Sequence, residues 1–183
     1  MPKVSEEHKE RRREQILDGA RRCFARHGYE GATVARLEQE IGLSRGAIFN
    51  YFPNKAALFV ALAIETSRRV TEVWFESGFR AVLDAVVAED PDWLAVQLEA
   101  TRRIRTDPDF RRVVEQTDRE LAASRGERLE RIRPHVRDDV PLEASAIFLS
   151  FVANGLALRQ AMGDPLPDLD ALAQLVDEGV APR

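Results

Sequence analysis

The sequence predicts an all-helical protein, and three observations support this. Apolar residues recur at spacings of three and four along nearly the whole chain, which is the period of an amphipathic helix. No segment alternates β-branched and polar residues cleanly enough to indicate a strand. Several Asp-Pro or Val-Pro pairs place proline in a first turn, where a backbone N–H has no helical partner. We expect about nine helices.

The first three expected helices are bounded by glycines and capping residues. An apolar stripe from Ile16 to Phe24 indicates a first helix that Gly28 can end, since glycine tolerates a left-handed conformation. Thr33 is a suitable N-cap for a short helix that ends before Gly42. Ser44 then caps another short helix, so the segment is predicted to form a helix, a tight turn and a helix.

The later helices start at proline or capping residues. They are predicted at Asn54–Glu76 with Gly78 as the stop, from Pro91, from Pro108, at Pro141–Met162, and from Asp168 onward. The segment 141–162 is apolar around most of its circumference. A helix of this kind needs a partner surface, because a peripheral helix could not leave so much apolar area in water.

Composition and cysteine usage exclude several classes of protein. With 44% hydrophobic and 32% charged residues, the 183-residue chain has the composition of an ordinary soluble protein. One cysteine and three widely spaced histidines allow neither a disulfide framework nor a Cys/His zinc site. The charged run 3–14 is unlike a signal peptide, and no run of about 18 uninterrupted apolar residues occurs. We therefore expect a cytoplasmic protein without a membrane partner.

Charge is distributed unevenly along the chain. Residues 1–60 hold 11 Lys/Arg against 8 Asp/Glu, a net charge of +3, so the remainder carries −7 to give the total of −4. The basic N-terminal part is the one that could approach phosphates.

The segment 33–58 has the pattern of a helix-turn-helix. Apolar residues that would hold its two helices together are Val34, Leu37, Ile41, Leu43, Ile48 and Phe52. The outward face of the second helix would then present Ser44, Arg45, Gly46, Ala47, Asn50 and Tyr51. This face of small residues is narrow enough to enter a major groove.

Each outward residue type suits a particular DNA contact. Arg45 can donate two hydrogen bonds to a guanine edge, and small Gly46 and Ala47 allow a close approach. Asn50 can bind an adenine or a phosphate, while hydroxyls, an ammonium and helix N-termini suit the phosphate backbone. The expected DNA-binding residues are Thr33, Arg36, Ser44, Arg45, Gly46, Ala47, Asn50, Tyr51 and Lys55.

This segment resembles the N-terminal module of the tetracycline-repressor (TetR) family. The family pattern is matched by Thr33, Gly42-Leu43-Ser44, Phe49, Tyr51-Phe52, Lys55 and Leu58. The resemblance implies a three-helix DNA-binding domain at 1–55, whose first ten residues we expect to be mobile, and an effector-binding and dimerisation domain at 56–183. It also implies a homodimer formed through the helices 141–162 and 168–179, bound to a double-stranded operator.

A narrower similarity is to the aconitase-repressor branch of that family. It rests on the segments 21–25, 44–49 and 105–108. The branch responds to citrate with magnesium, so the resemblance implies a polycarboxylate effector. Asn50 and Tyr51 depart from the histidine pair expected in that branch, which leaves operator and ligand open.

Polar residues on apolar-looking faces are candidates for the effector site. Seven-residue steps place Arg128 on a stripe with Val114 and Leu121, and a buried arginine needs an anionic partner. That partner is either a protein carboxylate, such as Glu99 or Asp118, or an acidic metabolite with a cation held by Asp177. The expected effector-binding residues are Gln97, Glu99, Arg103, Arg128, Asn154 and Asp177.

Two other kinds of protein compete with a DNA-binding regulator. An enzyme is disfavoured because the sequence has no Gly-rich phosphate loop, no nucleophile-elbow serine and no His-carboxylate cluster. A helical protein-interaction module without DNA binding stays open on the pattern alone. The sequence identifies neither the operator, the regulated genes nor the effector, nor whether the effector induces or co-represses.

Overall fold

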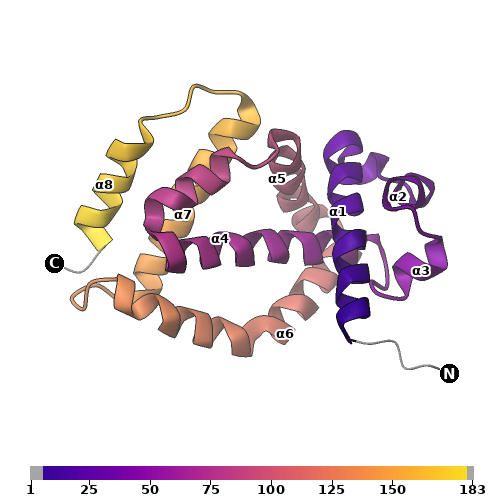
Figure 1. The fold of residues 1–183 in the computed structure, drawn as a ribbon, viewed down its shortest axis with the longest axis horizontal. Coiled ribbons are helices and arrows are strands. Elements are labelled where there is room, and N and C mark those ends of the chain that lie inside the picture. Colours follow the sequence, from indigo (N-terminus) through magenta and orange to yellow (C-terminus); the bar gives the residue numbers. More distant parts are fainter. Residues whose placement is uncertain (1–5, 181–183) are drawn as a thin grey trace. The chain divides into compact units, whose positions relative to one another are not determined.

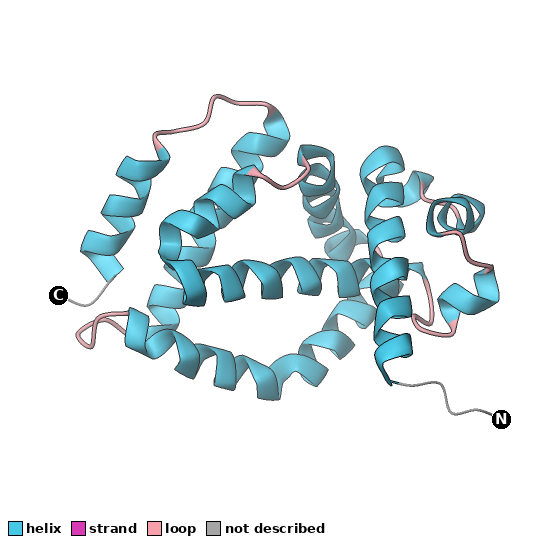
Figure 2. Cartoon of the chain, viewed as in Figure 1, coloured by secondary structure: helices cyan, strands magenta, loops and turns pink. Residues whose placement is uncertain are grey.

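The computed structural model describes residues 6–180, apart from the side chains of residues 118, 122–125 and 128. Within that part of the chain every regular element is a helix, as predicted (Figure 2). The helices are α1 (Glu6–Gly31), α2 (Val34–Ile41), α3 (Arg45–Phe49), α4 (Lys55–Val87), α5 (Pro91–Thr106), α6 (Pro108–Ile132), the 3-10 turn η1 (Arg133–His135), α7 (Leu142–Met162) and α8 (Leu169–Val180).

The chain divides into two compact units that do not follow one cut in the sequence. The first unit contains residues 1–65 and 96–114, and the second contains residues 66–95 and 115–183. The second half of α5 and the first turns of α6 therefore pack with the N-terminal helices. The functional boundary between residues 55 and 56 stays a prediction.

In the first unit, α2 and α3 lie along one side of α1 (Figure 1). Their shared core contains the fully buried side chains of Ile16, Leu37 and Ile48. Gly19 makes the close contact possible: a Cβ atom on it would lie 2.7 Å from the Cα of Ile41. Ile41 and Phe52 of the expected inward face are also buried, while Val34 and Leu43 are half-buried.

Positive φ angles occur at the predicted glycine positions. Gly42 ends α2 in the left-handed conformation, with φ 74° and ψ 28°, and its N–H donates to the Glu38 carbonyl. At Gly28 the backbone has φ 68° and ψ 173°, a combination open essentially to glycine alone. The helix is interrupted there and resumes to Gly31, so the predicted end at Gly28 is wrong and the glycine marks a kink.

The caps of the longer helices also follow the sequence. Asn54 accepts a 2.8 Å hydrogen bond from the Ala57 N–H at the start of α4. Asp90, Asp107 and Asp168 accept N–H groups in the first turns of α5, α6 and α8. Helix α4 continues past the predicted stop to Val87, with φ 78° at Gly78 marking a kink.

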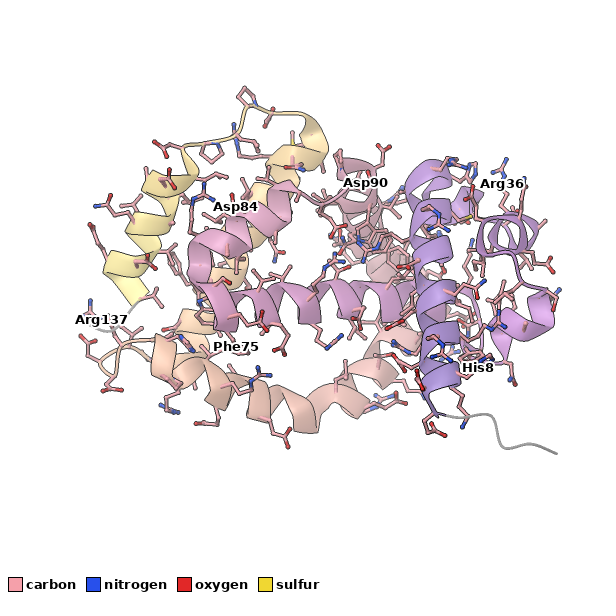
Figure 3. All side chains as sticks on the ribbon, in the orientation of Figure 1. His8, Arg36, Phe75, Asp84, Asp90 and Arg137 are labelled. Carbon is pink, nitrogen blue, oxygen red and sulfur yellow. The ribbon has the colours of Figure 1, made fainter. Side chains whose placement is uncertain are left out.

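The second unit has its own apolar core. It is built from Phe79, Val82, Leu83, Val86, Ile132, Val136, Leu149, Leu156, Ala173, Val176 and Val180. The C-terminal helix is held to this core at its end, where the Arg137 N–H donates to the Val180 carbonyl at 2.8 Å. Arg137 is seen beside α8 in Figure 3. The ion pair between Arg80 of α4 and Asp170 of α8, at 2.6 Å, is a second contact that holds α8.

Helix α7 leaves a broad apolar face in water. Phe151 is 69% exposed and Met162 is 66% exposed, and Ile147, Phe148 and Leu158 are exposed as well. On α8, Leu175 is 66% exposed. By length and composition alone α7 could cross a membrane, with 17% of its most apolar window buried. An exposed apolar face of this size is typical of a surface that a partner subunit covers.

Candidate nucleic-acid interface

The second helix of the helix-turn-helix is five residues long and depends on its caps. The Ser44 hydroxyl accepts the Ala47 N–H at 3.4 Å, and the Thr33 hydroxyl accepts the Arg36 N–H of α2 at 3.4 Å. A third contact crosses between helices, because the Arg45 N–H donates to the Glu38 carboxylate at 2.6 Å. The predicted N-caps are therefore confirmed, and Glu38 adds one that the sequence analysis missed.

The outward face of α3 is as small and as polar as expected. Ser44, Arg45, Gly46 and Asn50 are exposed, and nothing lies within 4 Å of the position a Cβ would take on Gly46. Ala47 and Tyr51 are half-buried. The inner side of the helix is anchored by Ile48, whose side chain is fully buried.

The arginines of this region differ in their availability. The guanidinium of Arg45 has no hydrogen bond or ion pair with any described residue. That of Arg36, labelled in Figure 3, donates to the Gly31 carbonyl at 2.8 Å. Arg26 pairs with the Glu40 carboxylate. Arg45 is thus the arginine at this surface that is ready to contact a ligand.

Lys55 is held by the end of α1. Its ammonium donates to the Tyr29 carbonyl at 2.8 Å and lies 4.4 Å from the centre of the Tyr29 ring. Burial lowers the pKa of Lys55 below its ordinary value of 10.5. Its contact with a phosphate stays a prediction, as do the other DNA contacts.

Tyr29 is the centre of a buried aromatic cluster in the first unit. Its ring stacks on Phe24 at 5.8 Å and meets Phe59 and Phe110 edge-on at 5.3 Å. The guanidinium of Arg103 lies 4.5 Å from the ring centre. Burial raises the pKa of Tyr29 to about 12. No motif in the sequence predicted this cluster.

Three expected effector residues, Gln97, Glu99 and Arg103, belong to the first unit, where Glu99 and Arg103 bind protein groups. The Glu99 carboxylate accepts the Tyr29 N–H at 3.4 Å. Arg103 pairs with Glu30, and with Asp107 at 3.1 Å. Arg103 is therefore paired with protein carboxylates, which the sequence analysis left open as the alternative to an acidic metabolite. These carboxylates are Glu30 and Asp107, whereas the examples given there were Glu99 and Asp118.

Asn154 and Asp177 in the second unit are more exposed than their positions suggested. Asn154 and Asp177 are exposed and Gln97 is half-buried, so the expectation that Asn154 and Asp177 lie on buried faces is wrong for the single chain. The side chain of Arg128 is outside the described part. Among the described residues no group of three His, Cys, Asp or Glu side chains is placed to hold a metal ion.

The regular elements of residues 6–180 are helices only, and a short capped helix among them presents small residues and an available arginine, which is the surface that a DNA-binding transcriptional regulator uses. Residues 16–62 match the family described as bacterial regulatory proteins, tetR family, and residues 76–182 match the BetI-type transcriptional repressor, C-terminal. The chain belongs to the TetR family.

Similar proteins agree with this assignment. The chain is 50% identical to the HTH-type transcriptional repressor Rv1474c of Mycobacterium tuberculosis, covering 98% of each. It is 46% identical to the HTH-type transcriptional repressor AcnR of Corynebacterium diphtheriae, covering 98% of this chain and 97% of that one. The expected similarity to the aconitase-repressor branch is confirmed, and these relatives are repressors rather than enzymes.

The fold is shared with a solved structure of low sequence identity. Salmonella enterica GusR superposes with a TM-score of 0.62 at 20% identity, covering 96% of this chain and 97% of that one.

Proposed function

We propose that the chain acts as a homodimeric repressor that binds a near-palindromic operator and is released from it by a small-molecule effector. The exposed, unpartnered guanidinium of Arg45 on a face of small residues is the observation that carries this proposal. In a two-fold dimer, two copies of α3 would enter successive major grooves about 34–36 Å apart.

In this proposal Arg45 contacts a DNA base and Lys55 contacts a phosphate of the DNA backbone. Duplexes selected by the protein from random DNA supply the operator. Replacing Arg45 by alanine should weaken operator binding by roughly 1–3 kcal/mol and relax the preference at one base position. Equal losses on operator and random duplexes would contradict this role. A wild-type protein without preference for any duplex would overturn the proposed function as a whole.

The dimer forms through α7 and α8. Their exposed apolar side chains, Phe151, Met162 and Leu175 among them, are too numerous to stay in water. A second copy of these helices is apolar in the same way and satisfies the two-fold symmetry of an operator. This covering also accounts for the apolar composition of α7, and a cytoplasmic location fits a protein that must reach DNA.

The effector is an acidic metabolite, with citrate and magnesium as the first candidate. The similarity to the aconitase-repressor branch suggests this choice, and we assign Arg128 and Asp177 to the metabolite and its cation. Binding changes DNA affinity only if the effector prefers one dimer geometry over the other.

The effector assignment has a direct test. The Arg128→Ala variant should bind the operator as the wild type does but should no longer be released by citrate with magnesium in a gel-shift titration. Unchanged release would remove Arg128 from the effector site. Tricarballylate, which has three carboxylates and lacks the hydroxyl, can then test how the ligand is recognised.

A further inference from the structure

The carboxylate of Glu38 joins the two helices of the DNA-binding motif at the point where the recognition helix begins. Its oxygen accepts the backbone N–H of Arg45, the first residue of α3, at 2.6 Å. Glu38 is half-buried on α2 and its backbone carbonyl also accepts the Gly42 N–H. Both ends of the turn between the helices are therefore tied to this residue.

Three features make this contact consequential. A hydrogen bond to an ionised carboxylate is among the stronger ones in proteins. A five-residue helix has almost no stability of its own, so its direction is set by its caps and packing. The contact is also made at Arg45, whose guanidinium is the available arginine of the surface.

We infer that Glu38 is a positioning residue for DNA recognition: it fixes the first turn of α3 on α2 and thereby sets the direction in which Arg45 enters the groove. This inference rests on the proposed function. The carboxylate also places a negative charge beside the DNA-facing surface, which weakens binding to every duplex through repulsion of phosphates. Glu38 thus lowers general affinity and sharpens discrimination.

Two conservative variants separate the hydrogen bond from the charge. Glu38→Gln keeps an oxygen acceptor at the same reach without the charge, so the ratio of operator to random-duplex affinity should stay within about twofold of wild type, while random-duplex affinity rises at low salt. Glu38→Asp keeps the charge but is one methylene too short. Its discrimination ratio should fall by roughly tenfold, with random-duplex affinity unchanged.

The control is Glu40→Gln, which removes a carboxylate from the same helix where it pairs with Arg26 of α1. It removes a charge without touching the Arg45 N–H, so the ratio of operator to random-duplex affinity should stay at the wild-type value. Amide hydrogen exchange of Arg45 in the free protein gives a second readout, which Glu38→Asp should accelerate and Glu38→Gln should not.

The possible outcomes distinguish this inference from the proposed function. If the wild type prefers its operator and Glu38→Asp keeps the wild-type ratio and the wild-type exchange rate at Arg45, the positioning role is overturned and the proposed function stands. If the wild type binds operator and random duplexes alike, both are overturned.

Discussion

The ammonium of Lys55 donates to the carbonyl oxygen of Tyr29 at 2.8 Å while it lies 4.4 Å from the centre of the same residue's ring. One residue of α4 thus satisfies the backbone at the end of α1 and interacts with its aromatic side chain. On the α5 side, the Glu99 carboxylate accepts the N–H of Tyr29. Tyr29 therefore links three helices of the first unit.

The raised pKa of Tyr29 makes stability depend on alkaline pH. Since the phenol titrates near pH 10.0 when unfolded and at about 12 in the fold, the folded chain retains a proton that the unfolded chain releases between these values. The stabilisation is complete below pH 10 and is lost as pH rises to about 12. The free energy of unfolding should fall by about 2–3 kcal/mol over this window.

Urea unfolding at a series of alkaline pH values measures this effect, with Tyr29→Phe as the variant that cannot titrate. The chain has two tyrosines, so Tyr51→Phe leaves Tyr29 as the only phenolate signal. A phenol that ionises near pH 10 in the folded Tyr51→Phe protein would contradict the prediction.

Replacing Lys55 by methionine should affect both stability and DNA binding. The change keeps the aliphatic stem but removes the hydrogen bond to Tyr29 and the cation–π contact, which should lower the free energy of unfolding by about 1–2 kcal/mol. If Lys55 also contacts a phosphate, affinity should fall alike for operator and random duplexes, and the salt dependence should become shallower. Selective loss on the operator alone would point to base reading.

Two glycines of the first unit, Gly19 on α1 and Gly46 on α3, should respond in opposite ways to alanine. In Gly19→Ala the new Cβ would lie 2.7 Å from the Cα of Ile41, so α1 and α2 must separate and stability should fall by about 1–3 kcal/mol. In Gly46→Ala the new methyl meets nothing within 4 Å, and the helix should gain about 0.5–1 kcal/mol.

Gly46→Ala should nevertheless weaken operator binding, because the methyl group lies on the face that approaches the bases. We expect a loss of about 1–3 kcal/mol, as for overpacking a close contact. Chemical denaturation and fluorescence anisotropy on the same samples separate the two effects. Wild-type affinity in Gly46→Ala would show that this part of α3 does not come close to DNA.

The exposed face of α7 predicts a variant that breaks the dimer. Phe151→Glu places a charge at a side chain that is 69% exposed in the single chain and central to the proposed interface. Dimerisation should weaken by about 2 kcal/mol or more, and operator binding should fall with it. Leu98→Glu on α5, where the side chain is 39% exposed, is the control. Sedimentation velocity over a range of concentrations measures the oligomeric state of each variant. If both variants stay dimeric, the exposed face of α7 is not the dimer interface.

Local signals in the sequence predicted most of the fold. The Asp-Pro starts, the caps at Thr33, Ser44 and Asn54, and the positive φ at Gly42 depend on neighbours a few residues away, so pattern alone reveals them. The predicted end of α4 is too early because a glycine kink and a glycine stop have the same local signature.

The parts that the sequence did not reveal depend on distant contacts. Tyr29 meets Glu99 and Phe110 across at least 70 positions, and no periodicity connects such residues. Glu38 looks like an ordinary solvated charge on α2 until the turn brings it to the Arg45 N–H. Asn154 and Asp177 appeared buried because a helix that is apolar on several sides gives no sign of which side a partner covers.

The exposed phenylalanine and leucine side chains of α7 and α8 also make repression depend on the concentration of the protein. A monomer with such an apolar surface tends to aggregate or to be degraded. The fraction of dimer rises with protein concentration by mass action. The amount of chain in the cell would then set a threshold for repression, so that a small change in its synthesis switches target genes more sharply than simple occupancy allows.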